Sequence, residues 1–123
     1  MRVLVVEDDP ALGDVIVSAL KDDGLDAKLA RDGDKVMRDV DDLSPAAMVL
    51  DLMMPRRDGF SVLRELRADG RISHLPIVVV TAIFGLSERL YATELGAADY
   101  VTKPFELDDL ISRVRALVAP QAA

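Results

Sequence analysis

Short apolar segments recur along the chain and predict strands near residues 2–6, 26–30, 46–50, 76–81 and 99–102. The runs at 3–6 and 48–50 contain no polar residue, which is typical of strands that are covered on both faces in a parallel sheet. In such a sheet, ligands bind at the carboxyl ends of the strands, where the winding direction reverses. The residues that follow each strand are therefore the first place to look for a functional site.

Between the strands, apolar residues recur at the spacing of amphipathic helices. The stripes are formed by Leu12, Val15, Ile16, Ala19 and Leu20; by Val36, Met37 and Val40; by Val62, Leu63 and Leu66; and by Leu107, Leu110, Ile111, Val114, Leu117 and Val118. A further helix near 87–95 has a thinner stripe. Asp58 is placed to cap the third helix, and left-handed helix ends are expected at Gly24, Gly70 and Gly96.

Five strands that alternate with five helices predict a single α/β domain with a five-stranded parallel sheet and helices on both faces. We expect the flavodoxin-like strand order 2-1-3-4-5, which makes the first and third strands neighbours at the switch point. The domain is expected to cover residues 1–118. Residues 119–123 are expected to form a tail or the start of a linker.

Composition narrows the class of function. The 123-residue chain carries a net charge of -7, which argues against direct binding of nucleic acid by this domain, because phosphates are neutralised by lysine and arginine. It has no cysteine, which excludes disulfides and thiolate sites. No apolar stretch is long enough to span a membrane, and a first strand that begins at residue 2 or 3 leaves no room for a signal peptide. A cytoplasmic protein is expected.

Carboxylates follow two of the predicted strands directly. Glu7, Asp8 and Asp9 follow the first strand, and Asp51 follows the third. Two carboxylates about 4 Å apart repel by roughly 4 kcal/mol at an effective dielectric near 20, so one must stay protonated or a cation must offset the charge. Oxygen ligands on an open loop suit Mg²⁺ (or Mn²⁺), and an aspartate beside such an ion can act as a nucleophile on phosphorus.

The later strands end in groups that suit a phosphate. Thr81 ends the fourth strand with a hydroxyl, and Lys103 follows the fifth strand with a cation. Both are expected at the same edge of the sheet as Asp51. Phosphoryl transfer needs little beyond such positioning and charge stabilisation.

In order and spacing, these motifs resemble the receiver domain of bacterial two-component response regulators. The resemblance covers residues 2–118 and rests on the segments 5–9, 50–55, 58–59, 80–82 and 96–105. It implies a phosphorylation-activated signalling domain, which accepts a phosphoryl group from a sensor histidine kinase or a phosphotransfer protein and controls an output. Such a domain assists its own phosphorylation and dephosphorylation but is not otherwise an enzyme.

The resemblance also implies roles for the metal-binding residues. Asp51 would be the phosphoacceptor and a ligand of the metal. Asp8 would bind Mg²⁺ directly, and Glu7 would act mainly through water. The backbone carbonyl of Met53 would be a further ligand.

The same resemblance implies roles for the remaining site residues. Thr81 would hydrogen-bond the phosphoryl group, and Lys103 would form an ion pair with it. Tyr100 would change rotamer on activation together with Thr81. The peptide bond between Lys103 and Pro104 would be cis.

Two features depart from the family pattern. Arg56 and Arg57 follow Pro55, where the family more often has a glycine and an apolar residue; we expect both arginines to be exposed to solvent. Met53 and Ile83 flank the expected phosphate, and neither can orient an attacking water. Slow loss of the phosphoryl group is expected.

The last third of the chain resembles the dimerising face of receivers attached to winged-helix DNA-binding domains. The residues that match are Arg89, Asp99, Asp109 and Arg113. Ala98 and Pro120 replace charged residues of that pattern, so the match is partial. A phosphorylation-dependent homodimer through this face is one expectation, and a monomer is the other.

Other interpretations remain. Glu7, Asp8 and Asp9 alone could be a solvated helix-start cluster, since acids favour helix N-termini. Tyr100 could simply pack, and His74, the only histidine, is not expected to be catalytic.

The sequence lacks the motifs of two competing functions. Phosphatases of the haloacid-dehalogenase type resemble one another in a second aspartate two residues after the nucleophilic aspartate. This chain has Met53 at that position. The first strand-to-helix turn contains neither the glycine fingerprint of a dinucleotide-binding site nor a P-loop. A phosphorylation-independent interaction module of the same fold remains an alternative.

Overall fold

The computed structural model describes residues 1–118. They contain one five-stranded parallel sheet. The strands are β1 (Arg2–Val6), β2 (Asp26–Ala30), β3 (Ala47–Leu50), β4 (Ile77–Thr81) and β5 (Asp99–Thr102). Their order across the sheet is β2-β1-β3-β4-β5. The predicted strands and their order are confirmed, and each boundary lies within one residue of its prediction.

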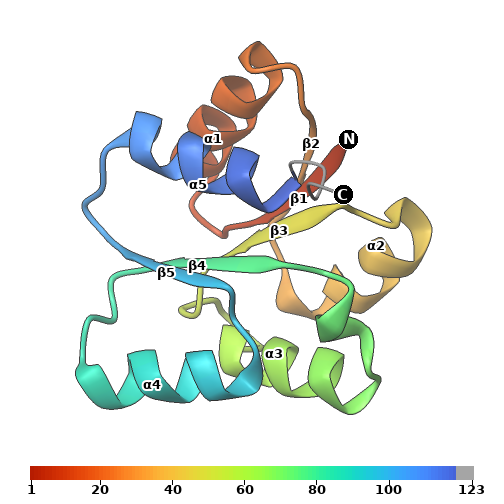
Figure 1. The fold of residues 1–123 in the computed structure, drawn as a ribbon, viewed down its shortest axis with the longest axis vertical. Coiled ribbons are helices and arrows are strands. Elements are labelled where there is room, and N and C mark those ends of the chain that lie inside the picture. Colours follow the sequence, from red (N-terminus) through yellow and green to blue (C-terminus); the bar gives the residue numbers. More distant parts are fainter. Residues whose placement is uncertain (119–123) are drawn as a thin grey trace.

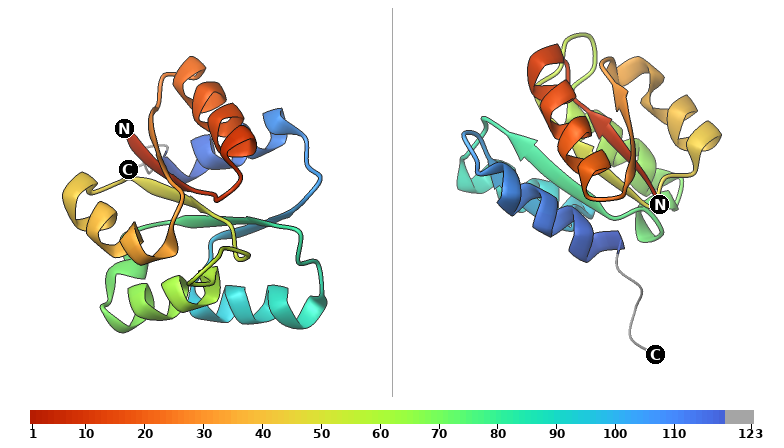
Figure 2. Two further views of the ribbon diagram at one scale, coloured as in Figure 1. Left: turned by 180° about the vertical axis from the view of Figure 1, so that it is seen from behind. Right: turned by 90° about the horizontal axis from the view of Figure 1, so that it is seen from above.

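Helices cover both faces of this sheet. They are α1 (Pro10–Asp22), α2 (Val36–Leu43), α3 (Gly59–Ala68), α4 (Leu86–Leu95) and α5 (Leu107–Val118), with short 3-10 turns η1 (Gly33–Lys35) and η2 (Arg71–Ser73). Figure 1 shows α1 and α5 on one side of the strands and α2, α3 and α4 on the other. The view from behind in Figure 2 keeps this division. The expected doubly wound arrangement is therefore confirmed.

The core has two layers because side chains along each strand alternate between the faces. On β1, Val3 and Val5 pack in the layer of α1 and α5, whereas Leu4 and Val6 pack in the layer of α2, α3 and α4. All the residues of β3 and β4 are buried. Each buried aliphatic side chain of this size contributes roughly 1.5–3 kcal/mol. The strands therefore form a firm frame on which charged residues can be held at the ends.

Helix caps leave two of the three N-terminal acids available for a site. Asp9 caps α1, and its Oδ1 accepts a hydrogen bond from the backbone N–H of Ala11 at 3.0 Å. Asp58 caps α3 as predicted, accepting from the N–H of Ser61 at 2.9 Å. Asp9 is thus the helix-start acid of its cluster. The predicted glycines also take left-handed backbone angles, at Gly24, Gly70 and Gly96.

Residues 119–123, the predicted tail with Pro120, lie outside the residues that the structure describes, and the domain boundary at residue 118 stays a prediction. Within residues 1–118, no helix combines the length and the apolar character that crossing a bilayer requires.

Candidate functional site: an acidic pocket at the carboxyl edge of the sheet

Strand register brings the predicted site residues to one edge. Val6 of β1 pairs with Leu50 of β3, and the N–H of Asp51 donates to the carbonyl of Val6 at 3.0 Å. On the other side of β3, the N–H of Lys103 donates to the carbonyl of Thr81 at 2.8 Å. The ends of β1, β3, β4 and β5 are therefore held side by side by backbone hydrogen bonds.

Three carboxylates converge at this edge. Glu7, Asp8 and Asp51 each offer an oxygen, and these oxygens lie within 4.8 Å of one another. Glu7 and Asp51 are only 2% and 4% exposed, whereas Asp8 is more open to solvent. Buried like charges repel strongly, so the cluster needs a compensating cation or a proton.

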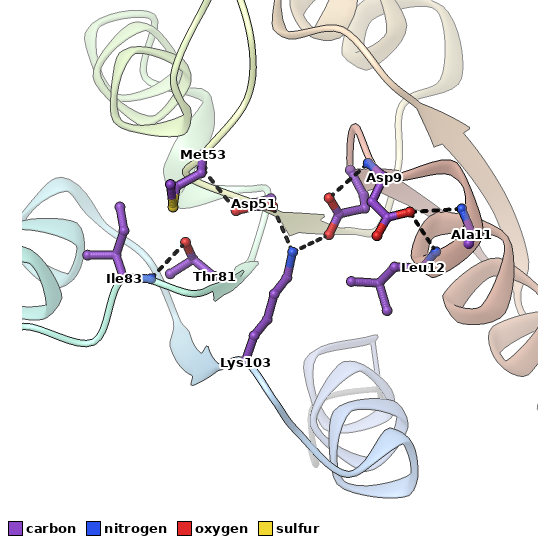
Figure 3. A network of polar contacts seen from close by, with 9 residues as sticks. Asp9, Ala11, Leu12, Asp51, Met53, Thr81, Ile83 and Lys103 are labelled. Atoms are coloured by element: carbon purple, nitrogen blue, oxygen red, sulfur yellow. Dashed lines mark hydrogen bonds and ion pairs between the residues drawn. The ribbon is translucent and has the colours of Figure 1, made fainter.

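Lys103 supplies a cation to this cluster. Its Nζ lies 2.7 Å from Oε1 of Glu7 and 2.8 Å from Oδ2 of Asp51, as Figure 3 shows for Asp51. Burial lowers the pKa of the Lys103 ammonium, but the hydrogen bonds to Asp51 and Glu7 outweigh this and leave it raised. Lys103 is therefore charged and contacts a carboxylate, that of Glu7, which lies 96 positions away in the chain.

Glu7 has an unusual proton affinity. Burial raises its pKa from 4.5 to about 7, and the neighbouring charge of Asp51 adds to the rise, although the hydrogen bond from Lys103 opposes it. A single ammonium group thus does not neutralise the whole cluster. A divalent cation would do so in place of a proton on Glu7.

The donor set fits Mg²⁺ or Mn²⁺. All the side-chain donors are carboxylate oxygens, and Asp8 faces solvent, so a bound ion could keep several waters as Mg²⁺ does in proteins. The N–H of Met53 donates to Oδ1 of Asp51 at 2.9 Å, which places the Met53 backbone beside the cluster. Direct ligation by Asp8 and Asp51, and a further ligand from the carbonyl of Met53, stay predictions.

Thr81 and Tyr100 are joined through one loop residue. Thr81 is fully buried, and its Oγ1 accepts a hydrogen bond from the N–H of Ile83 at 3.3 Å. The hydroxyl of Tyr100 donates to the carbonyl of Ile83 at 2.5 Å, and the ring is 6% exposed. Figure 3 shows Thr81 at the same edge as Asp51 and Lys103. The side chain at the end of β4 is thus coupled to the aromatic of β5.

Burial also keeps the hydroxyl of Tyr100 protonated. It raises the pKa of the hydroxyl above its ordinary value, and the charge of Glu88 adds to this effect. The guanidinium of Arg89 lies 5.7 Å from the ring centroid, within reach of a cation–π contact. Tyr100 therefore remains a hydrogen-bond donor at neutral pH and is held from α4 as well as from its own strand.

The two arginines after Pro55 behave differently from each other. The side chain of Arg56 is 71% exposed and pairs with Asp32 at 2.8 Å. Arg57 was expected to be exposed as well, but this is wrong: its side chain is 19% exposed, donates to Ser61 and pairs with Glu65. The first two turns of α3 explain the difference, since Ser61 offers hydroxyl and carbonyl oxygens to Arg57 and Glu65 offers a carboxylate.

Arg56 also takes an unusual backbone conformation. Its φ is +70°, in the left-handed region, which costs a residue other than glycine on the order of 1–3 kcal/mol. Asp32, its partner, was not predicted to belong to the site. The sequence held only a weak signal for it, as a cap residue before Gly33, and nothing that linked it to Arg56.

The predicted dimer face forms ion pairs within the chain. Nη1 of Arg113 lies 2.8 Å from both carboxylate oxygens of Asp99, and its Nε lies 3.1 Å from Asp109. Arg89 is the residue stacked on Tyr100. His74, which was not expected to act in the site, follows η2 near the start of β4, at the end of that strand away from the acidic pocket.

A doubly wound sheet with a lysine-bridged acidic pocket at its switch point defines a class of receiver-type signalling domains. A family model, described as the response regulator receiver domain, matches residues 3–115. The chain is 39% identical over 127 aligned residues to the DNA-binding dual master transcriptional regulator RpaA of Synechocystis sp., covering 99% of this chain and 53% of RpaA.

Two further comparisons agree. Response regulator MprA of Mycobacterium avium is 44% identical over 118 residues, covering 96% of this chain and 51% of MprA. The structure of the Francisella response regulator 1452 receiver domain is 32% identical, with a TM-score of 0.89 over 95% of each chain. The chain therefore spans about half the length of these curated relatives and essentially all of the solved receiver domain.

The chain belongs to the response regulator receiver domain family. Membership makes it a signalling phosphoacceptor of the two-component type rather than a catalytic enzyme. The acidic cluster of Glu7, Asp8 and Asp51 is consistent with the metal site of a receiver.

The raised pKa of Glu7 makes stability depend on pH. Between pH 4.5 and about 7, the folded chain keeps a proton on Glu7 that the unfolded chain has released, so the free energy of unfolding falls as pH rises through this window. Without divalent cations, we expect Glu7→Gln to flatten this slope and to stabilise the fold above that window by up to about 3 kcal/mol. Urea unfolding across the pH range measures both effects.

Glu94→Gln is the matched control, because that side chain is exposed on α4. It should leave the pH slope unchanged. An unaltered slope in Glu7→Gln would contradict the assignment of this proton to Glu7.

Proposed function

We propose that this receiver accepts a phosphoryl group on Asp51 from a sensor histidine kinase or a phosphotransfer protein and changes conformation to control an output. The observation that carries the proposal is the ion pair of Lys103 with both Glu7 and Asp51, at 2.7 and 2.8 Å. The pair places the ammonium group of Lys103 and the carboxylate of Asp51 together at the edge of the sheet where Thr81 also lies. Since the donor is a kinase fuelled by ATP, we expect the domain to work in the cytoplasm.

The chemistry follows from this arrangement. An oxygen of Asp51 attacks phosphorus, the phosphorus–nitrogen bond to the donor imidazole breaks, and the imidazole takes up a proton. Lys103 stabilises the charge that develops on the phosphoryl oxygens, and Thr81 offers them a hydroxyl donor. Bound Mg²⁺ or Mn²⁺, held by Asp8 and Asp51 with Glu7 nearby, would add charge neutralisation. The N–H of Met53 orients the carboxylate by holding its other oxygen.

Two competing functions receive less support. An aspartate-dependent phosphatase needs an acid or base close to its nucleophile, yet Met53 occupies the neighbouring position and its side chain is 55% exposed. A phosphorylation-independent interaction module would not require a buried carboxylate to be kept next to a lysine. Burying a charged pair costs desolvation free energy. A site whose chemistry needs these charges explains that cost better than a binding surface does.

Phosphorylation of Asp51 would be read through Thr81 and Tyr100. Each charge-assisted hydrogen bond from Thr81 or Lys103 contributes about 1.5–3 kcal/mol, and a shift from 1:99 to 99:1 needs about 5.5 kcal/mol. Two new contacts would together contribute about 3–6 kcal/mol, which is of the right order for such a shift. If Thr81 turns toward the phosphoryl group, the hydrogen bonds at Ile83 change, and Tyr100 loses the partner that holds it now.

The proposal predicts the outcome of incubation with acetyl phosphate and Mg²⁺. The chain should gain one phosphoryl group that persists at mildly acidic pH and is lost rapidly in base, as an acyl phosphate is, and Asp51→Asn should abolish the gain. Intact-protein mass spectrometry measures it, and Asp58→Asn, which alters a helix cap, is the control. Continuous release of phosphate without a modified intermediate would favour a phosphatase, and no modification of the wild type would favour an interaction module.

The lifetime of the phosphoryl group should be long. Met53 and Ile83 flank the site through their backbone contacts to Asp51 and Thr81, and neither carries a group that positions water. We expect Met53→Asn or Ile83→Glu to shorten the half-life by about tenfold, a small part of what a positioned general base supplies. The loss of the phosphorylated mass over time measures the half-life. If both variants kept the half-life of the wild type, the prediction would be contradicted.

The proposal extends to a homodimer that forms on phosphorylation. Arg113 already holds Asp99 and Asp109 within the chain, and Arg89 contacts Tyr100, so the expected dimer face is physically connected to the switch. A change at Tyr100 would release Arg89 for contacts across subunits. RpaA and MprA, which are about twice as long as this chain, are regulators, and RpaA is described as DNA-binding; an attached output domain of that kind is part of this proposal.

Sedimentation velocity tests the dimer. Phosphorylated wild type should sediment as a dimer and the unmodified chain as a monomer, while Arg89→Glu should remain monomeric although it is phosphorylated to the same extent. A fully phosphorylated wild type that stays monomeric would contradict this part of the proposal and leave phosphorylation at Asp51 untouched.

A further inference from the structure

The loop between β3 and α3, residues 51–58, is tied to another loop by an ion pair. Nη1 of Arg56 lies 2.8 Å from Oδ2 of Asp32, in the loop between β2 and α2. The other carboxylate oxygen of Asp32 accepts a hydrogen bond from the N–H of Asp34 at 2.9 Å and so caps η1. Asp32 is therefore fixed in its own loop with one oxygen and reaches Arg56 with the other.

The two loops also touch through their backbones. A side-chain carbon added at Gly33 would lie 2.8 Å from the carbonyl of Arg57, closer than such atoms can approach. Arg57 is in turn anchored to α3 through Ser61 and Glu65. Arg56 is thus left in a left-handed conformation between an anchored neighbour and the ion pair with Asp32.

We propose that the Asp32–Arg56 ion pair is a positioning element that holds the loop in the conformation in which Met53 orients Asp51, and that it thereby sets the affinity of the site for Mg²⁺. This rests on the proposed function. Neither residue touches the acidic cluster; both act through the loop backbone. The left-handed backbone of Arg56 is where the loop would relax first, because only contacts on both sides keep such a conformation in place.

The link from Arg56 to the site is short. Only two residues separate Arg56 from Met53, whose N–H holds Oδ1 of Asp51 at 2.9 Å. The N–H of Gly59 donates to the carbonyl of Leu52 at 2.9 Å, so the two ends of the loop are tied to each other. Arg56 and Met53 lie in the same closed segment between these two residues.

Simple electrostatics makes a different prediction from positioning. If Asp32 and Arg56 acted only by their charges, Asp32→Asn would weaken Mg²⁺ binding and Arg56→Gln would strengthen it. Positioning requires both substitutions to weaken it. Asp32→Asn also keeps an oxygen that can cap η1, so it removes the ion pair without removing the hydrogen bond to Asp34.

The experiment measures Mg²⁺ affinity by calorimetry and amide hydrogen exchange by NMR, both on the unphosphorylated chain. We expect Asp32→Asn and Arg56→Gln each to weaken Mg²⁺ binding by about three- to tenfold, at the lower end of the effect of residues that support metal ligands. The double variant should be no weaker than the single ones, and Arg56→Lys should restore part of the loss. Exchange at the amide of Met53 should be faster in both single variants without metal.

Asp41→Asn is the matched control. It removes the Arg71–Asp41 pair, which joins α2 to η2. It should change neither the affinity nor the exchange at Met53.

Failure of this inference can be told apart from failure of the proposed function. If the wild type binds Mg²⁺ and is phosphorylated but opposite shifts appear in Asp32→Asn and Arg56→Gln, or none, the ion pair has no positioning role. If the wild type fails to bind Mg²⁺, the proposed metal site and the effect on affinity are both overturned. Faster exchange in the variants would then still show that the pair orders the loop.

Discussion

Repulsion between carboxylates that the fold forces together is the constraint on which the rest of the structure depends. Glu7 and Asp51 are almost completely buried, within 4.8 Å of each other and of Asp8. Lys103 relieves part of the repulsion, but the pKa of Glu7 stays raised, mainly because the group is buried and further because of the charge of Asp51. Such a pocket favours positive charge, and a phosphoryl group bound there together with a metal ion would change the charge balance of the whole edge. The two-layered aliphatic core is what holds these groups in place against their repulsion.

The neighbouring polar contacts turn this local balance into a connection across the fold. Thr81 bonds the loop at Ile83, the same loop residue holds the hydroxyl of Tyr100, and Arg89 of α4 lies over that ring. The side chain of Thr81, beside Asp51, is thus linked in a few steps to the surface formed by α4 and β5. On the opposite side of the pocket, the loop that follows Asp51 is held by Asp32. The site therefore has one connection suited to signalling and another suited to keeping its geometry.

Prediction from the sequence succeeded where local rules act alone. The strands follow from apolar runs and Asp58 from its cap position, and left-handed glycines were expected and found at Gly24, Gly70 and Gly96. Arg57 was predicted wrongly, because its burial depends on oxygens of α3 that the local sequence does not reveal as partners. The adjacent Met53 and Met54 also differ, because only Met54 is buried. In both cases neighbouring residues of the same type point in different directions.

By itself, the sequence determined the alternation of strands and helices, the order of the strands and the presence of acids, a hydroxyl and a lysine after the strands. These features depend on periodicity and on the parallel arrangement, which orders all the strand ends along one edge. Only the tertiary structure decided which carboxylate Lys103 bridges, how strongly Glu7 holds its proton, and that Asp32 reaches Arg56. Distances of a few ångströms between distant residues, and the exclusion of water around them, fix these properties, and neither quantity is encoded in any local stretch of the chain.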